Sequence, residues 1–117
     1  MTEEWFWEGN VVEAICKHLM ADGWSIESRA NTETHEAGID ILAHKANKRL
    51  IVEVKGYPSE ANQRGKYKGQ PNRQRGTQAR IWFGDVLLSA ILRQDAYPDA
   101  EIAIAFPDFR TYSALLQ

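Results

Sequence analysis

The sequence predicts a mixed α/β fold, in which helices flank one β-sheet and the elements follow the order αβββαβα. Apolar residues recur every three or four positions in residues 9–22 and 77–94, as they do along one face of a helix. Short runs rich in apolar residues predict four strands, which begin near residues 24, 37, 49 and 101. The length of 117 residues suffices for one hydrophobic core, so we expect a single domain over residues 1–117.

The first helix is predicted by Val12, Ile15 and Leu19, which share one helical face, and Gly23 supplies its end. Cys16 lies among these residues and is expected to pack in the core, because cysteine is one of the most buried residue types. As the single cysteine of the chain, it has no partner for an internal disulfide, which fits a reducing compartment.

The strands predicted over residues 37–45 and 49–56 are expected to form a hairpin. The polar stretch between them contains turn-forming residues and can reverse the chain about Ala46 and Asn47. The order of these two strands along the chain therefore predicts an antiparallel pair.

Three charged side chains are expected to converge in this hairpin. Side chains alternate between the two faces of a strand, so Glu53 and Lys55 project from one face and Val54 from the other. The turn brings Asp40 opposite Glu53. Two carboxylates and a lysine then meet at the end of an otherwise apolar strand.

Such a group suits the hydrolysis of a phosphodiester. This reaction requires a neutralised phosphate, an activated water and a stabilised leaving oxygen, and a hard cation held by carboxylates serves all three ends. Asp40 and Glu53 are the candidate metal ligands, and the backbone carbonyl of Val54 can add an oxygen. Lys55 can orient or deprotonate the water and balance developing negative charge. The alternative interpretation is an exposed aspartate beside a surface ion pair.

A long, basic connection follows. Residues 57–76 contain two prolines and three glycines without sustained periodicity, and long connections of this kind are generally functional or disordered. No Asp or Glu occurs in residues 61–84, although the chain as a whole carries a net charge of −2. This segregation predicts contact with a polyanion, whereas the alternative is a merely solvated loop. The cations of this window are Arg64, Lys66, Lys68, Arg73, Arg75 and Arg80.

The second long helix is expected to begin with Thr77 as its cap and to run to about Gln94. Gln78 and Arg80 in its first turn are candidate DNA contacts, because the amino end of a helix presents donors to phosphate. A fourth strand and a short helix over residues 109–116 complete the chain. The apolar side chains of the long helix are expected to cover the sheet; they are Ile81, Val86, Leu87, Leu88, Ile91 and Leu92.

These motifs resemble those of the PD-(D/E)XK nuclease superfamily, which has the restriction-endonuclease-like fold, and within it the small Holliday-junction resolvases and Mrr-type restriction domains. Asp40, Glu53 and Lys55 match the superfamily's metal ligands and lysine, and the order of elements agrees over residues 9–106. Ile39 stands where the namesake proline would lie, which removes no ligand. The loop after Lys55 is longer than in compact resolvases.

The resemblance also implies an acidic residue on the first helix. Gly9-x-x-x-Glu13 followed by Gly23-Trp24 looks like the helix that supplies it, so the family spacing favours Glu13 as a catalytic and metal-binding residue. Glu8 is the alternative if the helix begins that early. Either carboxylate can instead be an ordinary acid at a helix start, favoured there by the helix dipole.

The resemblance thus implies a divalent-metal-dependent DNA endonuclease, with Mg²⁺ as the expected cofactor and Mn²⁺ as a substitute. The alternative is a non-catalytic nucleic-acid-binding module or subunit that keeps the fold. Cutting both strands requires two sites, so a homodimer is expected, through the second long helix and the segment Trp5-Phe6-Trp7, and a monomer that nicks one strand is the alternative. No apolar run approaches the ~20 residues of a membrane helix, and the acidic amino terminus lacks a signal peptide's basic region, so we expect a cytoplasmic protein.

Overall fold

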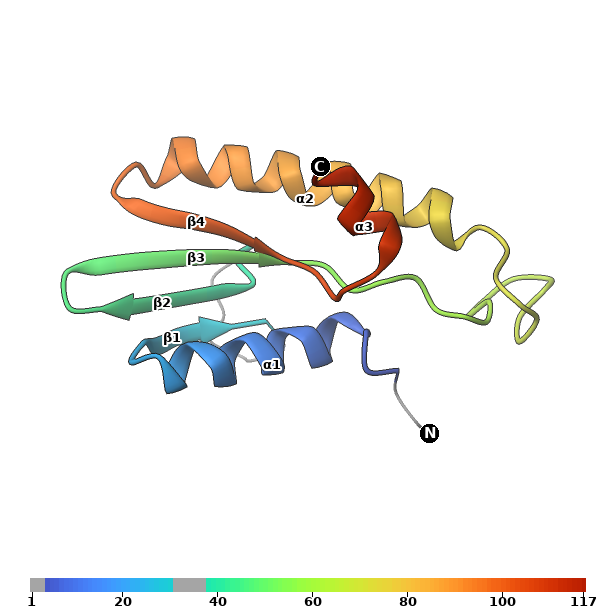
Figure 1. The fold of residues 1–117 in the computed structure, drawn as a ribbon, viewed down its shortest axis with the longest axis horizontal. Helices are drawn as coiled ribbons and strands as arrows, with labels where there is room; N and C mark the ends of the chain where they lie inside the picture. The colour runs from blue at the N-terminus through green and yellow to red at the C-terminus, as the bar shows by residue number, and fades with distance from the viewer. Residues whose placement is uncertain (1–3, 31–37) are drawn as a thin grey trace.

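Helices lie on both faces of a four-stranded sheet in the computed structural model, which describes residues 4–30 and 38–117 (Figure 1). The sheet has the strand order β1-β2-β3-β4, in which β1, β2 and β3 are antiparallel and β4 runs parallel to β3. The mixed α/β class and the element order agree with the prediction. The elements are α1 (Glu8–Ala21), β1 (Ser25–Arg29), β2 (Ile41–Lys45), β3 (Lys48–Val54), α2 (Arg75–Ala96), β4 (Ala100–Ala105) and α3 (Arg110–Leu115).

The predicted hairpin joins β2 and β3. Lys45 pairs with Lys48, so Ala46 and Asn47 form the turn between the strands. Ala46 adopts a φ of 54°, in the left-handed region that tight hairpin turns require. None of the helices within the described part of the chain is long and apolar enough to cross a lipid bilayer.

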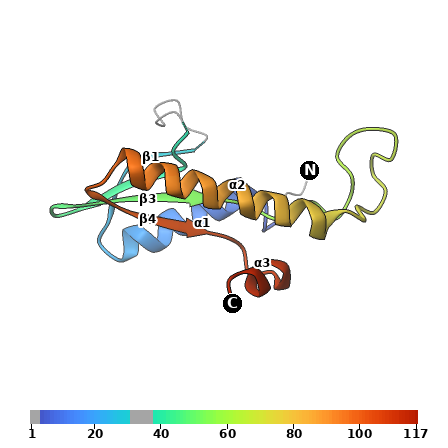
Figure 2. The same ribbon diagram turned by 90° about the horizontal axis from the view of Figure 1, so that it is seen from above.

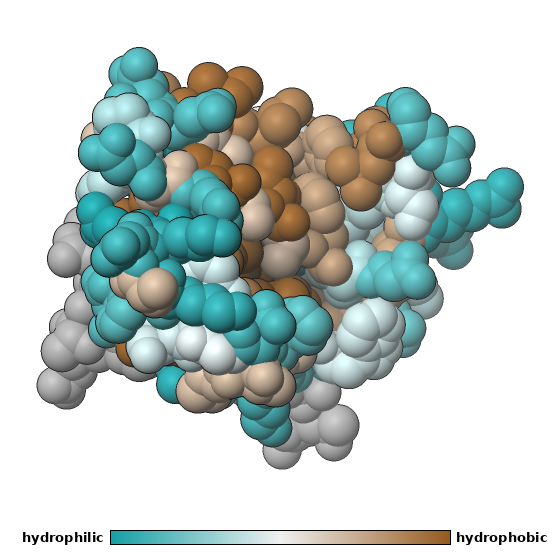
Figure 3. Space-filling view, turned by 60° about the vertical axis from the view of Figure 1, so that its left-hand side comes forward, coloured by the Kyte–Doolittle hydropathy of each residue, from teal (hydrophilic) through white to brown (hydrophobic). Residues whose placement is uncertain are grey.

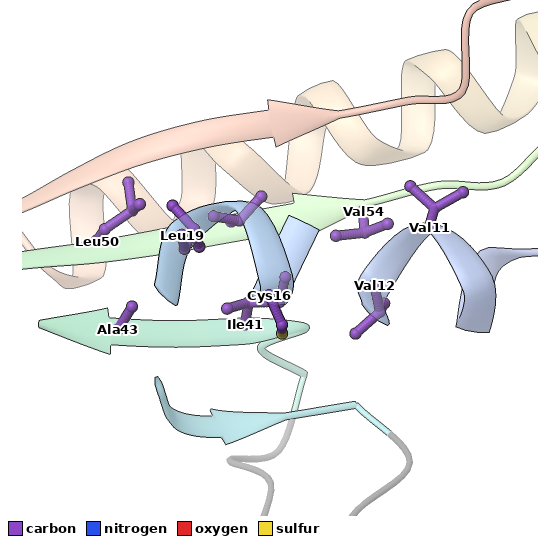
Figure 4. Packing of buried hydrophobic residues seen from close by; sticks show 9 residues of the cluster. Val11, Val12, Cys16, Leu19, Ile41, Ala43, Leu50 and Val54 are labelled. Atoms are coloured by element: carbon purple, nitrogen blue, oxygen red, sulfur yellow. The ribbon is translucent and has the colours of Figure 1, made fainter. Parts of the chain in front are cut away.

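One face of the sheet is covered by α1. Cys16 and Leu19 of this helix pack in a hydrophobic cluster with Ile41 of β2 and Val54 of β3 (Figure 4). The expected core position of Cys16 is confirmed, because its side chain is fully buried, and burial raises the pKa of its thiol. The apolar residues of β3 that alternate with Glu53 therefore hold the strand against α1.

The other face is covered by α2, but not through the side chains that the sequence predicts. The helix begins at Arg75, so Thr77 lies inside its first turn and does not cap it. Its buried positions are Ala79, Val86 and Ala90. Apart from Val86, the residues expected to cover the sheet are 43% to 60% exposed, so the prediction of an inward apolar face is wrong: these residues are Ile81, Leu87, Leu88, Ile91 and Leu92.

An aromatic cluster fixes the chain just beyond β3. Phe6 is buried there with Tyr57 and Tyr112, and the ring of Tyr57 stacks on Phe109 with a centroid separation of 3.9 Å. The hydroxyl of Tyr112 donates a hydrogen bond of 2.7 Å to the carbonyl of Gly56. The amino-terminal segment and α3 thus meet at the end of β3, where the chain leaves the sheet.

Residues 57–74, which we call the arm, connect β3 to α2 and project beyond the end of the sheet (Figures 1 and 2). The arm contains no helix or strand, apart from an isolated bridge between Ala61 and Pro71. The backbone N–H of Asn72 donates to the carbonyl of Glu60 at 2.7 Å and closes the base of the arm. The long connection that the sequence predicts is therefore organised by backbone hydrogen bonds.

Candidate active site

A polar pocket of about 180 Å³ lies at the end of β3, between the start of α1 and the middle of α2. We call it the β3 pocket. Its walls come from both helices and from the β2–β3 hairpin, so it exists only in the folded chain. Four carboxylates and one ammonium group line it: Glu8, Asp40, Glu53, Asp85 and Lys55.

The hairpin register places Asp40 in the β3 pocket. Ile41 pairs with Val52, so the residue before β2 lies opposite Glu53. The carboxylate of Asp40 accepts a hydrogen bond of 2.8 Å from the backbone N–H of Val54. This bond ties Asp40 to the end of β3, and Val54 itself lines the pocket beside these carboxylates.

Glu53 is the most buried acid of the pocket, with 2% of its surface exposed. Its carboxylate accepts a hydrogen bond of 2.8 Å from the Nε of Arg93, and the same guanidinium contacts the carbonyl of Gly38. Burial raises the pKa of Glu53, Arg93 opposes the rise, and the nearby Asp40 adds to it. A buried carboxylate needs a compensating cation, and Arg93 supplies one from α2.

Sequence reasoning missed Arg93, because no local motif links it to the hairpin. The helical spacing of α2 does contain a signal that could have identified it. Arg93 continues the spacing of Ala79, Val86 and Ala90, so a charged side chain occurs on the face of α2 that packs on the sheet. An inward arginine in a domain of this size calls for a buried acid opposite it.

Glu8, and not Glu13, is the helix acid at the β3 pocket. Its carboxylate lies 3.9 Å from the Nζ of Lys55. Burial raises the pKa of Glu8, Lys55 opposes the rise, and Asp40 reinforces it. Glu13 instead binds Arg29 through both carboxylate oxygens, at 2.9 and 3.0 Å, away from the pocket.

The choice between the two acids follows from the start of α1. The helix begins at Glu8, one residue earlier than the pattern predicts. Five positions along a helix rotate a side chain by about 140°, so Glu8 and Glu13 point in different directions. Family spacing alone could not distinguish them, because it does not give the first residue of the helix.

Lys55 enters the β3 pocket from the residue after β3. Its backbone N–H donates to the carbonyl of Ala105 at 3.1 Å, which fixes the chain beside β4. Its Nζ lies 5.5 Å from the centroid of the Trp82 ring on α2. Trp82 and Glu8 thus hold the ammonium group from opposite elements, and about a third of the side chain, 30%, remains accessible to solvent.

The donors of the β3 pocket suit a hard divalent cation, because carboxylate and carbonyl oxygens are the ligands that Mg²⁺ prefers. Asp40, Glu53 and the carbonyl of Val54 supply such oxygens. In residues 4–30 and 38–117, however, no three His, Cys, Asp or Glu side chains lie close enough together to hold a metal ion. Arg93 also occupies one oxygen of Glu53. The donor chemistry therefore fits the cation, whereas its coordination by Glu53 would require Arg93 to share or release this carboxylate.

The predicted DNA contacts lie outside the β3 pocket. Most are exposed on the arm and on the first turns of α2; these are Arg64, Lys66, Lys68, Arg73, Gln78 and Arg80. Arg75 differs, because its guanidinium lies 4.9 Å from the centroid of Tyr57 and its Nε donates to the carbonyl of Pro58 at 3.0 Å. Arg75 is thus engaged by the aromatic cluster and is less exposed than the other predicted DNA contacts.

Comparisons of the chain with protein-family models, curated proteins and solved structures found no match. The β3 pocket combines clustered carboxylates with a lysine held near them, and exposed cations lie on the neighbouring arm. This combination is suited to a cation-assisted reaction on a polyanion.

Proposed function

We propose that the chain is a divalent-metal-dependent DNA endonuclease of the PD-(D/E)XK type, with a restriction-endonuclease-like fold. The observation that carries the proposal is the meeting of Asp40, Glu53 and Lys55 in one pocket at the end of β3. Their approach depends on the hairpin register and on α2, and each residue type matches its role in phosphodiester hydrolysis. The exposed cations of the arm support DNA as the substrate.

Asp40, Glu53 and the carbonyl of Val54 are the residues that would hold Mg²⁺ or Mn²⁺. When bound, such a cation neutralises the phosphate and lowers the pKa of a coordinated water. The chain's own part is to keep these oxygens together. The backbone N–H of Val54 orients Asp40, and the packing of β3 against α1 keeps Glu53 on the opposite face.

Lys55 supplies positive charge where negative charge develops during cleavage. Glu8 is a positioning residue for Lys55, because its carboxylate lies 3.9 Å from the ammonium group. With Trp82 on its other side, Lys55 is held near the carboxylates and not released to solvent. The accessory acid in this proposal is therefore Glu8 in place of Glu13.

Arg93 is a positioning residue for Glu53. It compensates the charge of this buried carboxylate and links it to the carbonyl of Gly38. A cation that binds Glu53 must share the carboxylate with Arg93 or displace it. The guanidinium of Arg93 would therefore compete with the metal ion for Glu53.

The second candidate function is DNA binding without cleavage, as a module or subunit. One observation favours it: Arg93 neutralises Glu53, so the folded pocket is compensated without a metal ion. A protein that only binds DNA would use the cations of the arm. Its Glu53 would remain paired with Arg93 and would not bind a metal ion.

Cleavage of DNA in a series of Mg²⁺ and Mn²⁺ concentrations separates these functions. Supercoiled, linear, single-stranded and branched DNA should be tested, because the motifs do not define the preferred form. Asp40→Asn and Glu53→Gln should each abolish cleavage while DNA binding in chelator survives. Glu13→Gln is the matched control, since its carboxylate lies away from the β3 pocket, and it should cleave like the parent.

Two results would contradict the proposed nuclease function. Full activity of Asp40→Asn or Glu53→Gln across the metal series would remove these residues as ligands. A parent protein that binds DNA but cleaves none of the four forms with either metal would support the non-catalytic binding module.

A further inference from the structure

A second cavity, of about 380 Å³, opens within the arm, and we call it the arm cavity. Its volume lies within the range of ~300–1,000 Å³ that is typical of small-molecule sites. It shares no lining residue with the β3 pocket. One aromatic ring, three amide side chains, one proline and one guanidinium line it: Tyr67, Asn62, Gln70, Gln74, Pro71 and Arg73.

The walls of the arm cavity are held by the backbone of the arm itself. Asn62 donates its N–H to the carbonyl of Gln70 at 2.8 Å and accepts the N–H of Gly69 at 2.8 Å. The side-chain amide of Asn62 donates to the carbonyl of Tyr67 at 3.1 Å. Gly65 and Gly69 have φ values of 87° and 85°, which glycine adopts without strain. The cavity is therefore formed before a ligand enters, which reduces the ordering cost of binding.

The chemistry of these walls fits a nucleobase. The ring of Tyr67 is 57% exposed and offers a stacking surface, and base stacking on such rings is a main source of affinity for unpaired nucleic acid. The side-chain amides of Gln70 and Gln74 lie in the same cavity, and planar amides hydrogen-bond the edges of bases. The Nζ of Lys66 lies over the Tyr67 ring, 5.7 Å from its centroid, and Lys66 does not line the arm cavity, so a base would stack on the part of the ring that borders the cavity.

We propose that the arm cavity binds one unpaired nucleotide of the DNA. The base stacks on Tyr67, the amides of Gln70 and Gln74 contact its edge, and Lys66 and Arg73 bind its phosphates. This inference rests on the proposed function, because it takes DNA as the ligand. A base inside a duplex cannot enter, since its faces are stacked and its pairing edge is occupied. The preferred substrate is therefore DNA that contains an unpaired nucleotide.

Binding in a chelating buffer tests this preference without interference from cleavage. Two labelled duplexes of one sequence are compared by fluorescence anisotropy, one fully paired and one with a single unpaired nucleotide. The parent should bind the second about tenfold more tightly, within the range that one stacked base contributes. Tyr67→Ala should abolish this preference, and Tyr67→Phe should keep it because the ring remains.

Lys68→Ala is the matched control, because Lys68 belongs to the arm but does not line the arm cavity. It should lower the affinity for both duplexes equally and keep the preference for the unpaired nucleotide. A 2-aminopurine at the unpaired position reports stacking directly: its emission should change on binding to the parent and to Tyr67→Phe, but not to Tyr67→Ala. Thermal unfolding of Tyr67→Ala should match the parent, since this ring is largely exposed.

Equal affinity of the parent for the two duplexes would overturn the inference and leave the nuclease standing, because cleavage is tested separately through Asp40 and Glu53. A proportional loss of affinity for both duplexes in Tyr67→Ala would also overturn it. Failure of the parent to bind any DNA in this buffer would instead reject the proposed function, and the inference with it.

Discussion

Glu53 and Arg93 carry opposite charges in the interior of a small domain, and each depends on the other. The side chain of Glu53 is 3% exposed and that of Arg93 is 24% exposed, so water screens the pair only from the side of the arginine. Removing one partner of such a pair leaves an uncompensated charge, which costs more than the pair itself contributes.

Arg93→Met should therefore destabilise the protein by about 3 kcal/mol in chelator at neutral pH. Addition of Mg²⁺ or Mn²⁺ should restore more stability to this variant than to the parent, because Arg93 no longer competes for Glu53. Urea unfolding with and without the cation measures both effects. Arg80→Met, exposed on the same helix, is the control and should change stability little. Parent-like stability of Arg93→Met would show that Glu53 does not need this cation.

The pH dependence of stability should report the raised pKa of Glu53. Burial raises this pKa above its ordinary value of 4.5, so the folded state binds the proton more tightly than the unfolded state. The stability from this group is complete below 4.5 and is lost as the pH rises through the folded pKa. In chelator, the melting temperature of the parent minus that of Glu53→Gln should thus fall as the pH rises above the ordinary value of 4.5. A difference that rises with pH would contradict the raised pKa.

Lys55→Met tests the ammonium group while keeping most of the side chain. Single-turnover cleavage should slow at least tenfold, which corresponds to about 1.4 kcal/mol of barrier. DNA affinity in chelator should change much less, because one charge among several is lost. A smaller effect on the rate would remove Lys55 from the chemistry.

Among the elements, the arm and the start of α2 divide their cations between two uses. Arg64, Lys66, Lys68 and Arg73 are exposed, whereas Arg75 lies against the rings of Phe6, Tyr57 and Phe109. One terminal nitrogen of Arg75 is buried and has no hydrogen-bond partner in the described part of the chain. The exposed cations are therefore available to a ligand, whereas Arg75 is engaged by the aromatic rings.

The salt dependence of DNA binding should distinguish these two groups. Lys68→Ala combined with Arg73→Ala should lower the slope of log affinity against log salt by about two, as expected for two lost phosphate contacts on a duplex. Arg75→Ala should leave the slope unchanged and lower thermal stability instead, through lost cation–π contacts. Anisotropy titrations on a paired duplex at several salt concentrations measure the slope. An unchanged slope in the double variant would mean that the arm is merely solvated.

The outer face of α2 carries five exposed apolar side chains. Apolar side chains gather along the upper edge of the molecule, over α2 (Figure 3). The exposed stripe extends from Ile81 to Leu92, about 16 Å along the helix at ~1.5 Å per residue. Gly84 lies within it, and a Cβ there would meet nothing within 4 Å, which leaves room for a close helix.

We propose that a second copy of the chain covers this stripe, so that α2 packs on α2 about a two-fold axis. Cleavage of both strands requires two β3 pockets, and one chain supplies one. In the segment Trp5-Phe6-Trp7, Phe6 is buried, while Trp5 and Trp7 are 62% and 47% exposed. The stripe therefore offers five exposed apolar side chains for the contact, against two in the amino-terminal segment.

Leu88→Lys should convert the dimer to a monomer, because it places a charge at the centre of the stripe. Sedimentation velocity at micromolar concentration measures the mass of the parent and of the variant, with and without DNA. Lys17→Glu, at an exposed position on α1, is the control and should leave the dimer intact. A purely monomeric parent under all these conditions would reject the homodimer.

Local sequence patterns were sufficient to predict the element order, the β2–β3 hairpin and the meeting of Asp40, Glu53 and Lys55. These features depend on local rules, since a strand alternates its side chains and a short turn sets the register. A shift of one residue would send Glu53 to the α1 face. The apolar residues on either side of Glu53 exclude that shift, and they are visible in the sequence.

Which side chains the helices contribute to this hairpin depends on the packing of the whole fold. Arg93 approaches Glu53, Glu8 replaces Glu13, and Arg75 joins the aromatic cluster. The apolar pattern of α2 suggested the wrong inward face, because the buried carboxylate of Glu53 requires a cation and the close approach to the sheet requires alanines. Each of these outcomes depends on the rotation and the first residue of a helix relative to a distant strand. A periodic pattern gives the period of a helix, whereas its rotation is set by the packing and charge of the surface it covers.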